Sequence, residues 1–371
     1  MNIVILKTSA NFNDNKKIFN AIERLGHNLV GFVALGTIPD IVEVEGYNFY
    51  PIEYIQRLKY DIALIDCGIA SAQNYVPLLV HFEIPLHKVG TFHWLLKQLF
   101  FKKYEDIKDP VIQETLAYWQ THELDVFNQH TAGAETTLDE VYIDESCNLP
   151  YINFKTVEGK ERRMYYPRDG SSQVQGADGK KYVKDVLREQ VPTSPHLYIK
   201  GTHKVDEGDV LIDAGVCEGN FSLRYVDICS KVYLFEMDKK WFEPLYYSFK
   251  DCWDKVEFIP RAVSDSTRGG VDVALDDVVN VPVGSKIFLK MDVEGAEPAA
   301  LRGANKILST NKVKASICSY HKADDIVKIK SIFQNHGYRT ATSEGYMVFI
   351  WDEKIWETVD FRKGIVYATN C

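Results

Sequence analysis

A regular alternation of strand-like and helix-like segments from residue 208 onward is the feature that most limits the possible folds. Amphipathic segments at helical spacing separate five apolar, β-branched stretches, at 210–215, 231–238, 256–265, 286–295 and 313–321. Such alternation favours a parallel sheet with helices on both faces. Two more strands are expected at 338–343 and 346–351, and they should form an antiparallel hairpin because no helix fits between them. The predicted fold is a doubly wound α/β domain with seven strands.

The N-terminal part of the chain also reads as α/β. Strand-like runs such as NIVIL and NLVGFVAL flank a helical pattern. The first crossover loop, at 7–15, contains no glycine, whereas a dinucleotide-binding turn needs glycines so that the backbone can approach a pyrophosphate. We therefore expect an accessory Rossmann-like domain at 1–95 with a scaffold or substrate-side role, a helical linker at 96–135, and the main domain at 136–371.

The charge and cysteine pattern excludes several classes of protein. A formal net charge of −9 argues against a nucleic-acid partner held by a basic surface. The sequence has no uncharged apolar run of eighteen or more residues, so no membrane span is predicted. The seven cysteines are odd in number and include no C-x-x-C, which supports neither a disulfide framework nor a zinc knuckle. These features predict a reduced, cytoplasmic protein.

The stretch LIDAGVCEGNFS, at 211–222, raises the question of a small-molecule site. An apolar run ends at Asp213, and Gly215 and Gly219 follow at a spacing suited to a turn between a strand and a helix. Backbone N–H groups of this turn are expected to face a ligand, with the Asp213 carboxylate beside it. Glu236 ends the next predicted strand, 17 residues after Gly219, where a carboxylate can accept hydrogen bonds from a ribose. The site suits an adenosine with a short amino-acid tail better than a dinucleotide, although a plain tight turn would look similar.

These motifs resemble a known family. The C-terminal half is similar to the FkbM-type S-adenosylmethionine-dependent O-methyltransferases over about residues 208–340, and the resemblance rests on the stretches LIDAGVCEGNFS, VYLFEMD, RAVSD, VALDDV, FLKMDVEGAEPAALRGA, SYHKADDI and HGYRT. It implies a Rossmann-like class I methyltransferase domain and S-adenosylmethionine as cofactor. It also implies that Met237, Ala262 and Asp265 border the cofactor. The implied acceptor is a hydroxyl of a sugar, including nucleotide-linked sugars, in surface-glycan (capsule or lipopolysaccharide) or natural-product biosynthesis.

Catalytic groups are expected at the carboxyl edge of the strands beside the cofactor turn. Lys290, Asp292 and Glu294 alternate, so they would share one face of an extended strand. Tyr320 and His321 end the next strand, and adjacent strands lie about 4.8 Å apart, so that His321 and Asp292 should converge on one substrate hydroxyl.

We assign His321 as general base, mostly neutral at pH 7, and Asp292 as its partner or as a ligand of the substrate hydroxyl. Glu294 and Tyr320 are assigned to substrate binding. Two alternatives stay open: His321 caps the following helix, or Lys290 is a structural partner of Asp292 or Glu294.

Several questions stay open at the level of sequence. Asp276, Asp277 and Asp292 offer oxygen ligands for magnesium, but the first two read equally well as a helix start, so no metal site is favoured. A scaffold protein that binds without turnover is the main alternative function. A nicotinamide enzyme is disfavoured because neither half contains G-x-G-x-x-G. The acceptor, the oligomeric state, including a homo-oligomer, and the role of the N-terminal domain are not determined.

Overall fold

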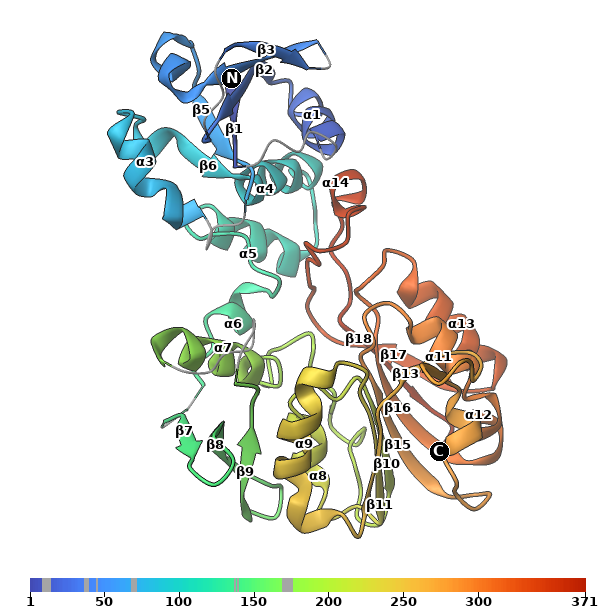
Figure 1. Ribbon diagram of the computed structural model, residues 1–371. Coiled ribbons are helices and arrows are strands. Elements are labelled where there is room, and N and C mark those ends of the chain that lie inside the picture. Colours follow the sequence, from blue (N-terminus) through green and yellow to red (C-terminus); the bar gives the residue numbers. More distant parts are fainter. Residues whose placement is uncertain are drawn as a thin grey trace. The chain divides into compact units, whose positions relative to one another are not determined.

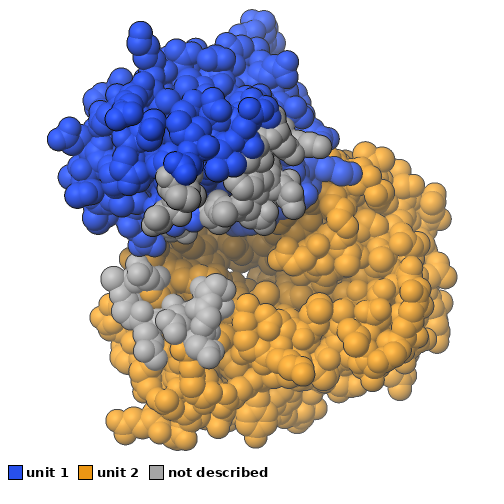
Figure 2. Space-filling model, turned by 45° about the horizontal axis from the view of Figure 1, so that its top comes forward, with its two compact units in different colours: residues 1–125, 350–360 blue, residues 126–349, 361–371 orange. Residues whose placement is uncertain are grey.

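The computed structural model describes residues 1–8, 15–36, 40–44, 46–67, 72–136, 138, 140–168 and 176–371. The chain forms two compact units (Figure 2). The first comprises residues 1–125 and 350–360, and the second comprises residues 126–349 and 361–371. These boundaries differ from the predicted ones in two respects. Most of the predicted linker, 96–135, belongs to the first unit, and residues 350–360 also belong to the first unit although they lie near the C-terminus.

The first unit contains a six-stranded sheet in the order β3-β4-β2-β1-β5-β6. Its strands are β1 (Asn2–Lys7), β2 (Asn28–Ala34), β3 (Val42–Val44), β4 (Tyr47–Pro51), β5 (Ile62–Ile65) and β6 (Val89–Thr91). All neighbouring pairs are parallel except β3 with β4. The predicted parallel α/β arrangement is therefore present in this unit.

Helices of the first unit include one from the far end of the chain. They are α1 (Asn15–Arg24), α3 (Val76–His81), α4 (Phe92–Lys103), α5 (Pro110–Trp119) and α14 (Ile355–Thr358), with 3-10 turns η1 (Ile52–Arg57), η2 (Gln73–Tyr75) and η3 (Leu86–Lys88). Asp109 caps α5 by accepting hydrogen bonds from two backbone N–H groups, and Pro110 occupies the first helical position. Helix α14 is attached by the Arg24 guanidinium, which donates to the carbonyl oxygen of Trp356.

The second unit is built on a seven-stranded sheet in the order β12-β11-β10-β15-β16-β18-β17 (Figure 1). The strands are β10 (Val210–Ala214), β11 (Lys231–Phe235), β12 (Val256–Ile259), β15 (Lys286–Met291), β16 (Lys312–Cys318), β17 (Arg339–Thr342) and β18 (Ile365–Thr369). The first five strands of the order are parallel, and β18 is antiparallel to both of its neighbours. The doubly wound seven-stranded sheet predicted from the sequence is present.

Helices cover both faces of this sheet, as period-two alternation along its strands requires. In β10, Leu211 joins the core on the face of α8 and α9, whereas Val210 and Ile212 join the core on the face of α11–α13. The elements between the strands are α8 (Asn220–Tyr225), η4 (Lys239–Trp241), α9 (Phe242–Phe249), η5 (Lys250–Cys252), α10 (Leu275–Val278), α11 (Glu297–Arg302), α12 (Asn305–Thr310) and α13 (Asp325–Asn335).

The antiparallel pair at the end of the sheet differs from the predicted hairpin. Strand β17 pairs with β18, at 365–369, and not with residues 346–351. All but the last residue of β18 are buried, and its side chains alternate between the two cores. In 346–351, by contrast, Met347 makes only isolated bridges and the Trp351 side chain is 66% exposed. Apolar content alone did not distinguish these two stretches.

Smaller elements precede and flank the main sheet. They are α6 (Gln129–Ala132), the antiparallel strands β7 (Tyr142–Asp144), β8 (Leu149–Lys155) and β9 (Glu161–Tyr165), helix α7 (Gly176–Arg188), and the parallel pair β13 (Ala262–Val263) and β14 (Asp272–Val273). Among the described residues, every helix is too short or too polar to cross a lipid bilayer.

Candidate active site

The glycine turn after β10 adopts the backbone that its sequence predicts. Gly215 has φ +78° and Gly219 has φ +82°, both in the left-handed region that favours glycine. A Cβ on Gly215 would lie 1.7 Å from the carbonyl oxygen of Asp292, and one on Gly219 would lie 2.9 Å from the Phe249 ring. Gly215 therefore allows the turn to pack directly against the segment that follows β15.

Four backbone N–H groups of this turn bond within the protein, whereas the sequence suggested that the turn's N–H groups face a ligand. Gly215 and Val216 donate to the Phe235 carbonyl oxygen at 3.0 and 3.2 Å. Cys217 N–H donates to Glu236 Oε2 at 2.9 Å, and Gly219 N–H donates to the carbonyl of Val216. A ligand at this turn would therefore meet carbonyl oxygens and side chains in place of these donors.

Asp213 and Lys290 form a buried ion pair beneath the turn. Lys290 Nζ lies 2.9 Å from Asp213 Oδ1, and Ser222 Oγ donates to Asp213 Oδ2 at 2.6 Å. Burial alone would lower the pKa of Lys290, but the Asp213 and Asp292 carboxylates raise it above its usual value. Asp213 is therefore not exposed beside a ligand, and the structural partner of Lys290 is Asp213 rather than Asp292 or Glu294.

Glu236 and Met237 follow β11 and differ in exposure. Glu236 is buried, and its two carboxylate oxygens accept backbone hydrogen bonds from Cys217 at 2.9 Å and Asp238 at 2.7 Å. Each oxygen retains capacity for a further hydrogen bond. The Met237 side chain is 61% exposed, so its apolar surface is accessible to a ligand.

The turn also contains a buried acid that sequence reasoning missed. Glu218 lies between the two glycines and is only 7% exposed. Burial raises its pKa to about 7, which the positive charge of Lys290 only partly offsets. Its position inside the D-x-G-x-x-x-G motif was visible in the sequence, but its burial was not.

Residues predicted to border an adenine lie in and after β13. Ala262 is half-buried and its N–H donates to the Val271 carbonyl oxygen at 3.0 Å. The Asp265 carboxylate pairs with Arg268 at 3.0 Å and lies 3.9 Å from Arg302. Its side chain is therefore held in surface ion pairs.

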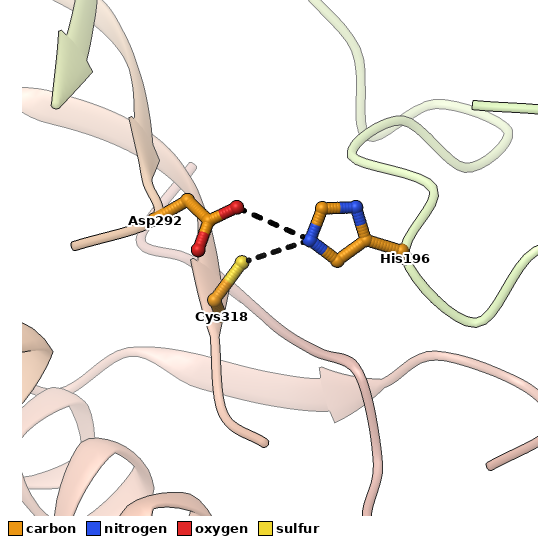
Figure 3. A group of neighbouring side chains, drawn as sticks. All are labelled: His196, Asp292 and Cys318. Atoms are coloured by element: carbon orange, nitrogen blue, oxygen red, sulfur yellow. Dashed lines mark hydrogen bonds and ion pairs between the residues drawn. The ribbon is translucent and has the colours of Figure 1, made fainter. Parts of the chain in front are cut away.

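Asp292 is the centre of a polar cluster at the carboxyl edge of the sheet. It follows β15 directly, and its backbone N–H donates to the Ala214 carbonyl oxygen at 2.9 Å. Its Oδ2 lies 3.2 Å from His196 Nε2 (Figure 3). The same oxygen accepts a hydrogen bond from the Tyr198 hydroxyl at 2.9 Å. Its Oδ1 lies 3.4 Å from His321 Nε2. Asp292 and His321 therefore converge as predicted from neighbouring strands.

His321 is surrounded by carboxylates. Its Nδ1 lies 3.0 Å from Glu297 Oε1, and its Nε2 lies 3.5 Å from Glu294 Oε2 as well as facing Asp292. Burial alone would lower the pKa of His321, but Glu297, Asp292 and Glu294 raise it to about 9. These carboxylates favour the protonated imidazolium at pH 7, whereas the sequence suggested a mostly neutral imidazole. His321 is buried against these groups, so it is not merely the cap of α13, which begins at Asp325.

The predicted shared face of Lys290, Asp292 and Glu294 does not extend beyond the strand. Strand β15 ends at Met291, and Glu294 has φ +54°. The Glu294 side chain is 83% exposed, whereas that of Lys290 is 5% exposed. Glu297 begins α11 as predicted, but its carboxylate is fully buried and also accepts the Val293 N–H at 2.9 Å.

Three members of the cluster were not predicted. His196 and Tyr198 come from the segment SPHLY before the sheet, and Cys318 ends β16. Tyr320, predicted for substrate binding, places its hydroxyl 3.2 Å from His196 Nε2. The segment SPHLY carries neither helical nor strand periodicity, so nothing in its pattern indicated that it folds over the sheet edge.

The aspartates considered for magnesium are used elsewhere. Asp276 accepts hydrogen bonds from the backbone N–H groups of Lys306 and Ile307, at 2.7 and 2.9 Å, and so caps α12. Asp277 accepts from the Thr267 hydroxyl. Both residues lie in the first turn of α10, as the helix-start interpretation expects.

A cavity of about 560 Å³ in the second unit is distinct from this cluster. Leu197 and Ile199 line it together with Phe221 of α8, whereas His196 and Tyr198, which alternate with them, contact Asp292. The segment 196–199 thus separates the cavity from the acidic cluster.

Comparison with known proteins identifies the domain type. Residues 272–340 match the family model of the methyltransferase FkbM domain. No curated protein matches the chain.

Three solved structures illustrate the structural comparisons. Methyltransferase FkbM from Methylobacillus flagellatus KT aligns over 99% of this chain and 89% of its own, with 14% identity and a TM-score of 0.41. Precorrin-6y C5,15-methyltransferase from Geobacter metallireducens GS-15 aligns over 45% of this chain and 81% of its own, with 14% identity and a TM-score of 0.29. A Streptococcus mutans protein in complex with SAH aligns over 44% of this chain and 90% of its own, with 14% identity and a TM-score of 0.29.

The family match includes Asp292, Glu294, Tyr320 and His321, and over residues 272–340 it confirms the resemblance stated from the sequence. These residues lie at the carboxyl edge of the seven-stranded sheet. Residues 272–340 of this chain therefore belong to a methyltransferase domain of the FkbM type.

Proposed function

We propose that this protein is an S-adenosylmethionine-dependent O-methyltransferase that acts on a hydroxyl of a sugar, including a nucleotide-linked sugar. The observation that carries the proposal is the direct packing of the glycine turn against Asp292, where a Cβ on Gly215 would lie 1.7 Å from the Asp292 carbonyl oxygen. This packing brings the proposed cofactor turn and the polar cluster around Asp292 to the same sheet edge. In open α/β sheets, ligands bind at that edge.

The charges around the turn suit a cation better than a pyrophosphate. Four backbone N–H groups of the turn already bond within the protein, so they are not available to phosphate oxygens. Glu218 and Glu236 lie beside the turn, and both are carboxylates with little exposure. These carboxylates suit the positive charge of a sulfonium cofactor. They do not suit the anionic phosphates of a nicotinamide dinucleotide.

The residues that would hold the cofactor follow from these positions. Gly215 and Gly219 shape the turn, Glu236 has free lone pairs for ribose hydroxyls, and Met237 offers an exposed apolar surface. Ala262 and Asp265 are assigned to the adenine side by the family resemblance. S-adenosylmethionine, when bound, supplies an electrophilic methyl group on a positively charged sulfur.

The chain's own contribution is to hold the acceptor hydroxyl. The Asp292 side chain is 21% exposed, whereas that of His321 is 3% exposed and lies behind it. We therefore assign the direct hydrogen bond with the acceptor hydroxyl to Asp292, and to His321 the role of holding Asp292. This changes the division of roles expected from the sequence, in which His321 was the base. Fixing the hydroxyl in line with the methyl group can supply a large part of the rate enhancement.

A sugar acceptor is proposed from the family resemblance and is compatible with the exposed acids. Glu294 presents an 83% exposed carboxylate close to Asp292, and paired carboxylates can accept hydrogen bonds from several hydroxyl groups of one sugar. Surface-glycan or natural-product biosynthesis would be the pathway class.

The test is methyl transfer from labelled S-adenosylmethionine to a panel of nucleotide sugars and free sugars, by the full chain, with and without Mg²⁺. Transfer to a sugar hydroxyl that is lost in Asp292→Asn, with cofactor binding retained by calorimetry, supports the proposal. Binding of S-adenosylmethionine without transfer to any acceptor would favour the scaffold alternative. Failure to bind the cofactor at all would reject both.

A further inference from the structure

His196 Nε2 is the meeting point of more polar atoms than one ring nitrogen can bond. Asp292 Oδ2 lies 3.2 Å away, Cys318 Sγ 3.3 Å, the Tyr320 hydroxyl 3.2 Å and the Tyr198 hydroxyl 3.4 Å. A ring nitrogen has either one hydrogen or one lone pair. It therefore makes one good hydrogen bond. The Tyr198 and Tyr320 hydroxyls can donate to the Asp292 carboxylate, at 2.9 and 3.5 Å, so the approach that needs a further explanation is that of His196, Asp292 and Cys318 to one another.

A bound cation would explain this convergence. His196 Nε2, an Asp292 oxygen and Cys318 Sγ all lie within 4.8 Å of one another. In tetrahedral zinc sites, bonds of about 2.0–2.3 Å place neighbouring ligand atoms about 3.3–3.6 Å apart. The distances from Nε2 to Oδ2 and Sγ, 3.2 and 3.3 Å, are close to that range (Figure 3).

We propose that His196, Asp292 and Cys318 bind a divalent transition-metal ion of the zinc class. A nitrogen, a carboxylate oxygen and a sulfur are donors that zinc, cobalt and related ions accept together, whereas magnesium and calcium prefer oxygen alone. Three protein ligands leave a fourth position open for water or another oxygen ligand. The proposal goes beyond methyl transfer, because metal binding requires neither cofactor nor acceptor.

The fold holds the three ligands in place before any metal binds. Asp292 and Cys318 belong to neighbouring parallel strands, and the register pairs Met291 with Ile317, so the two ligands occupy adjacent positions at the strand ends. The exposed fractions of His196 and Cys318 are 2% and 0%. Such burial excludes competing water and limits side-chain motion.

The outer contacts also resemble those of a metal site. The other ring nitrogen of His196, Nδ1, has no hydrogen-bond partner among the described residues, but it lies 3.6 Å from Glu189 Oε2. A histidine that binds a metal commonly directs its second nitrogen toward a carboxylate. A second group, Asp292 with Glu297 and His321, is also compact. There, each ring nitrogen of His321 faces a carboxylate, so ion pairing already accounts for its geometry.

The test uses the full chain, stripped with a chelator and then titrated with Zn²⁺ or Co²⁺. We expect about one equivalent to bind, and the cobalt form should show a thiolate-to-metal absorption band in the near ultraviolet with strong tetrahedral bands in the visible. Cys318→Ser should abolish the thiolate band, and His196→Gln should weaken binding at least about tenfold, as loss of a metal ligand implies. Cys229→Ser is the matched control, since Cys229 is also a buried cysteine of the second unit.

The outcomes separate this proposal from the proposed function. Absence of binding, a cobalt spectrum without a thiolate band, or unchanged binding in both Cys318→Ser and His196→Gln would overturn the metal site. Circular dichroism shows whether Cys318→Ser and His196→Gln fold. If one of them does not, the metal binding of the other variant tests the proposal. Calorimetry with S-adenosylmethionine on the stripped protein tests the cofactor site separately, so either proposal can fail while the other stands.

Discussion

Lys290 Nζ and Asp213 Oδ1 lie 2.9 Å apart, and their side chains are 5% and 1% exposed. Lys290 also donates to the Gly215 carbonyl oxygen, so one ammonium group joins β15, β10 and the glycine turn. This arrangement makes Lys290 part of the foundation of the site, one layer below the residues that would meet a ligand.

Removing one partner of this pair should strongly destabilise the second unit. Asp213→Asn leaves a buried ammonium without its counter-charge, for which a loss of about 3–5 kcal/mol in the free energy of unfolding is expected. The double variant Asp213→Asn, Lys290→Met should lose less than the single one because no buried charge is left unpaired. Urea denaturation measures both. Lys155→Met, in an exposed pair with Glu161, is the control and should cost no more than about 1 kcal/mol. A loss of similar size in Asp213→Asn and Lys155→Met would contradict the assigned role.

The close approach at Gly215 predicts a steric effect that can be separated from backbone strain. Gly215 and Gly208 have similar positive φ angles, +78° and +81°, but within the described part of the chain no atom lies within 4 Å of a Cβ placed on Gly208. Gly208→Ala should therefore cost only the conformational strain, about 1–2 kcal/mol. Gly215→Ala must also displace the Asp292 backbone, so it should destabilise the protein more and weaken S-adenosylmethionine binding. Thermal unfolding and calorimetry on both variants provide the comparison, and equal effects would show that the contact with Asp292 is unimportant.

Features set by periodicity and strand register could be predicted from the sequence. Alternating strands and helices gave the seven-stranded sheet, and the order of β15 and β16 placed Asp292 beside His321. Positive φ at Gly215 followed from the length of the turn. Each of these depends on local pattern plus the fixed geometry of parallel strands.

Features that depend on long-range packing could not be predicted in this way. Residues 346–351 and 365–369 are both apolar, and only the packing shows that the second becomes β18. His196 comes from a segment without periodicity, and its approach to Asp292 depends on how that segment crosses the sheet edge. The ionisation of His321 depends on three carboxylates gathered from separate positions, including Glu297, which had been assigned only to a helix start.

His203 should make the second unit less stable in mild acid. Its Nε2 lies 3.1 Å from Ser316 Oγ, and burial, assisted by Lys314, lowers its pKa from 6.5 to about 4. The folded state therefore binds the proton more weakly than the unfolded state, so this contribution to stability is complete above pH 6.5 and is lost as pH falls toward 4. The size is at most on the order of 3 kcal/mol. Urea denaturation between pH 4 and 7 should show a flatter pH dependence for His203→Gln, and an unchanged slope would contradict this assignment.

Glu218 predicts that cofactor binding depends on pH near neutrality. Its pKa is raised to about 7, so the carboxylate becomes charged as pH increases from 6 to 8. A negative charge in the turn favours a cation nearby, and the affinity for S-adenosylmethionine should therefore increase over this range. The demethylated cofactor, SAH, lacks the sulfonium charge, so its affinity should change less with pH. Calorimetry at several pH values provides the measurement, with Glu218→Gln as the variant that should flatten the profile. A steep profile in that variant would assign the effect to another group.

Glu236 and Asp292 should affect different steps of the reaction. Glu236 folds onto the turn through Cys217 and Asp238, so Glu236→Gln should mainly raise the KM for S-adenosylmethionine, with kcat changed little. Asp292 contacts the proposed acceptor position, and Asp292→Asn should mainly lower kcat, by roughly 10²-fold, because the hydroxyl is no longer held in line with the methyl group. Initial rates with the cofactor varied at saturating acceptor separate the two effects. Because Asp292→Asn also alters the environment of His321, the variant Glu294→Gln at the exposed neighbour is the control, and its kcat should fall much less. If both variants raise the KM for S-adenosylmethionine and lower kcat to the same extent, the turn and the acidic cluster do not have separate roles.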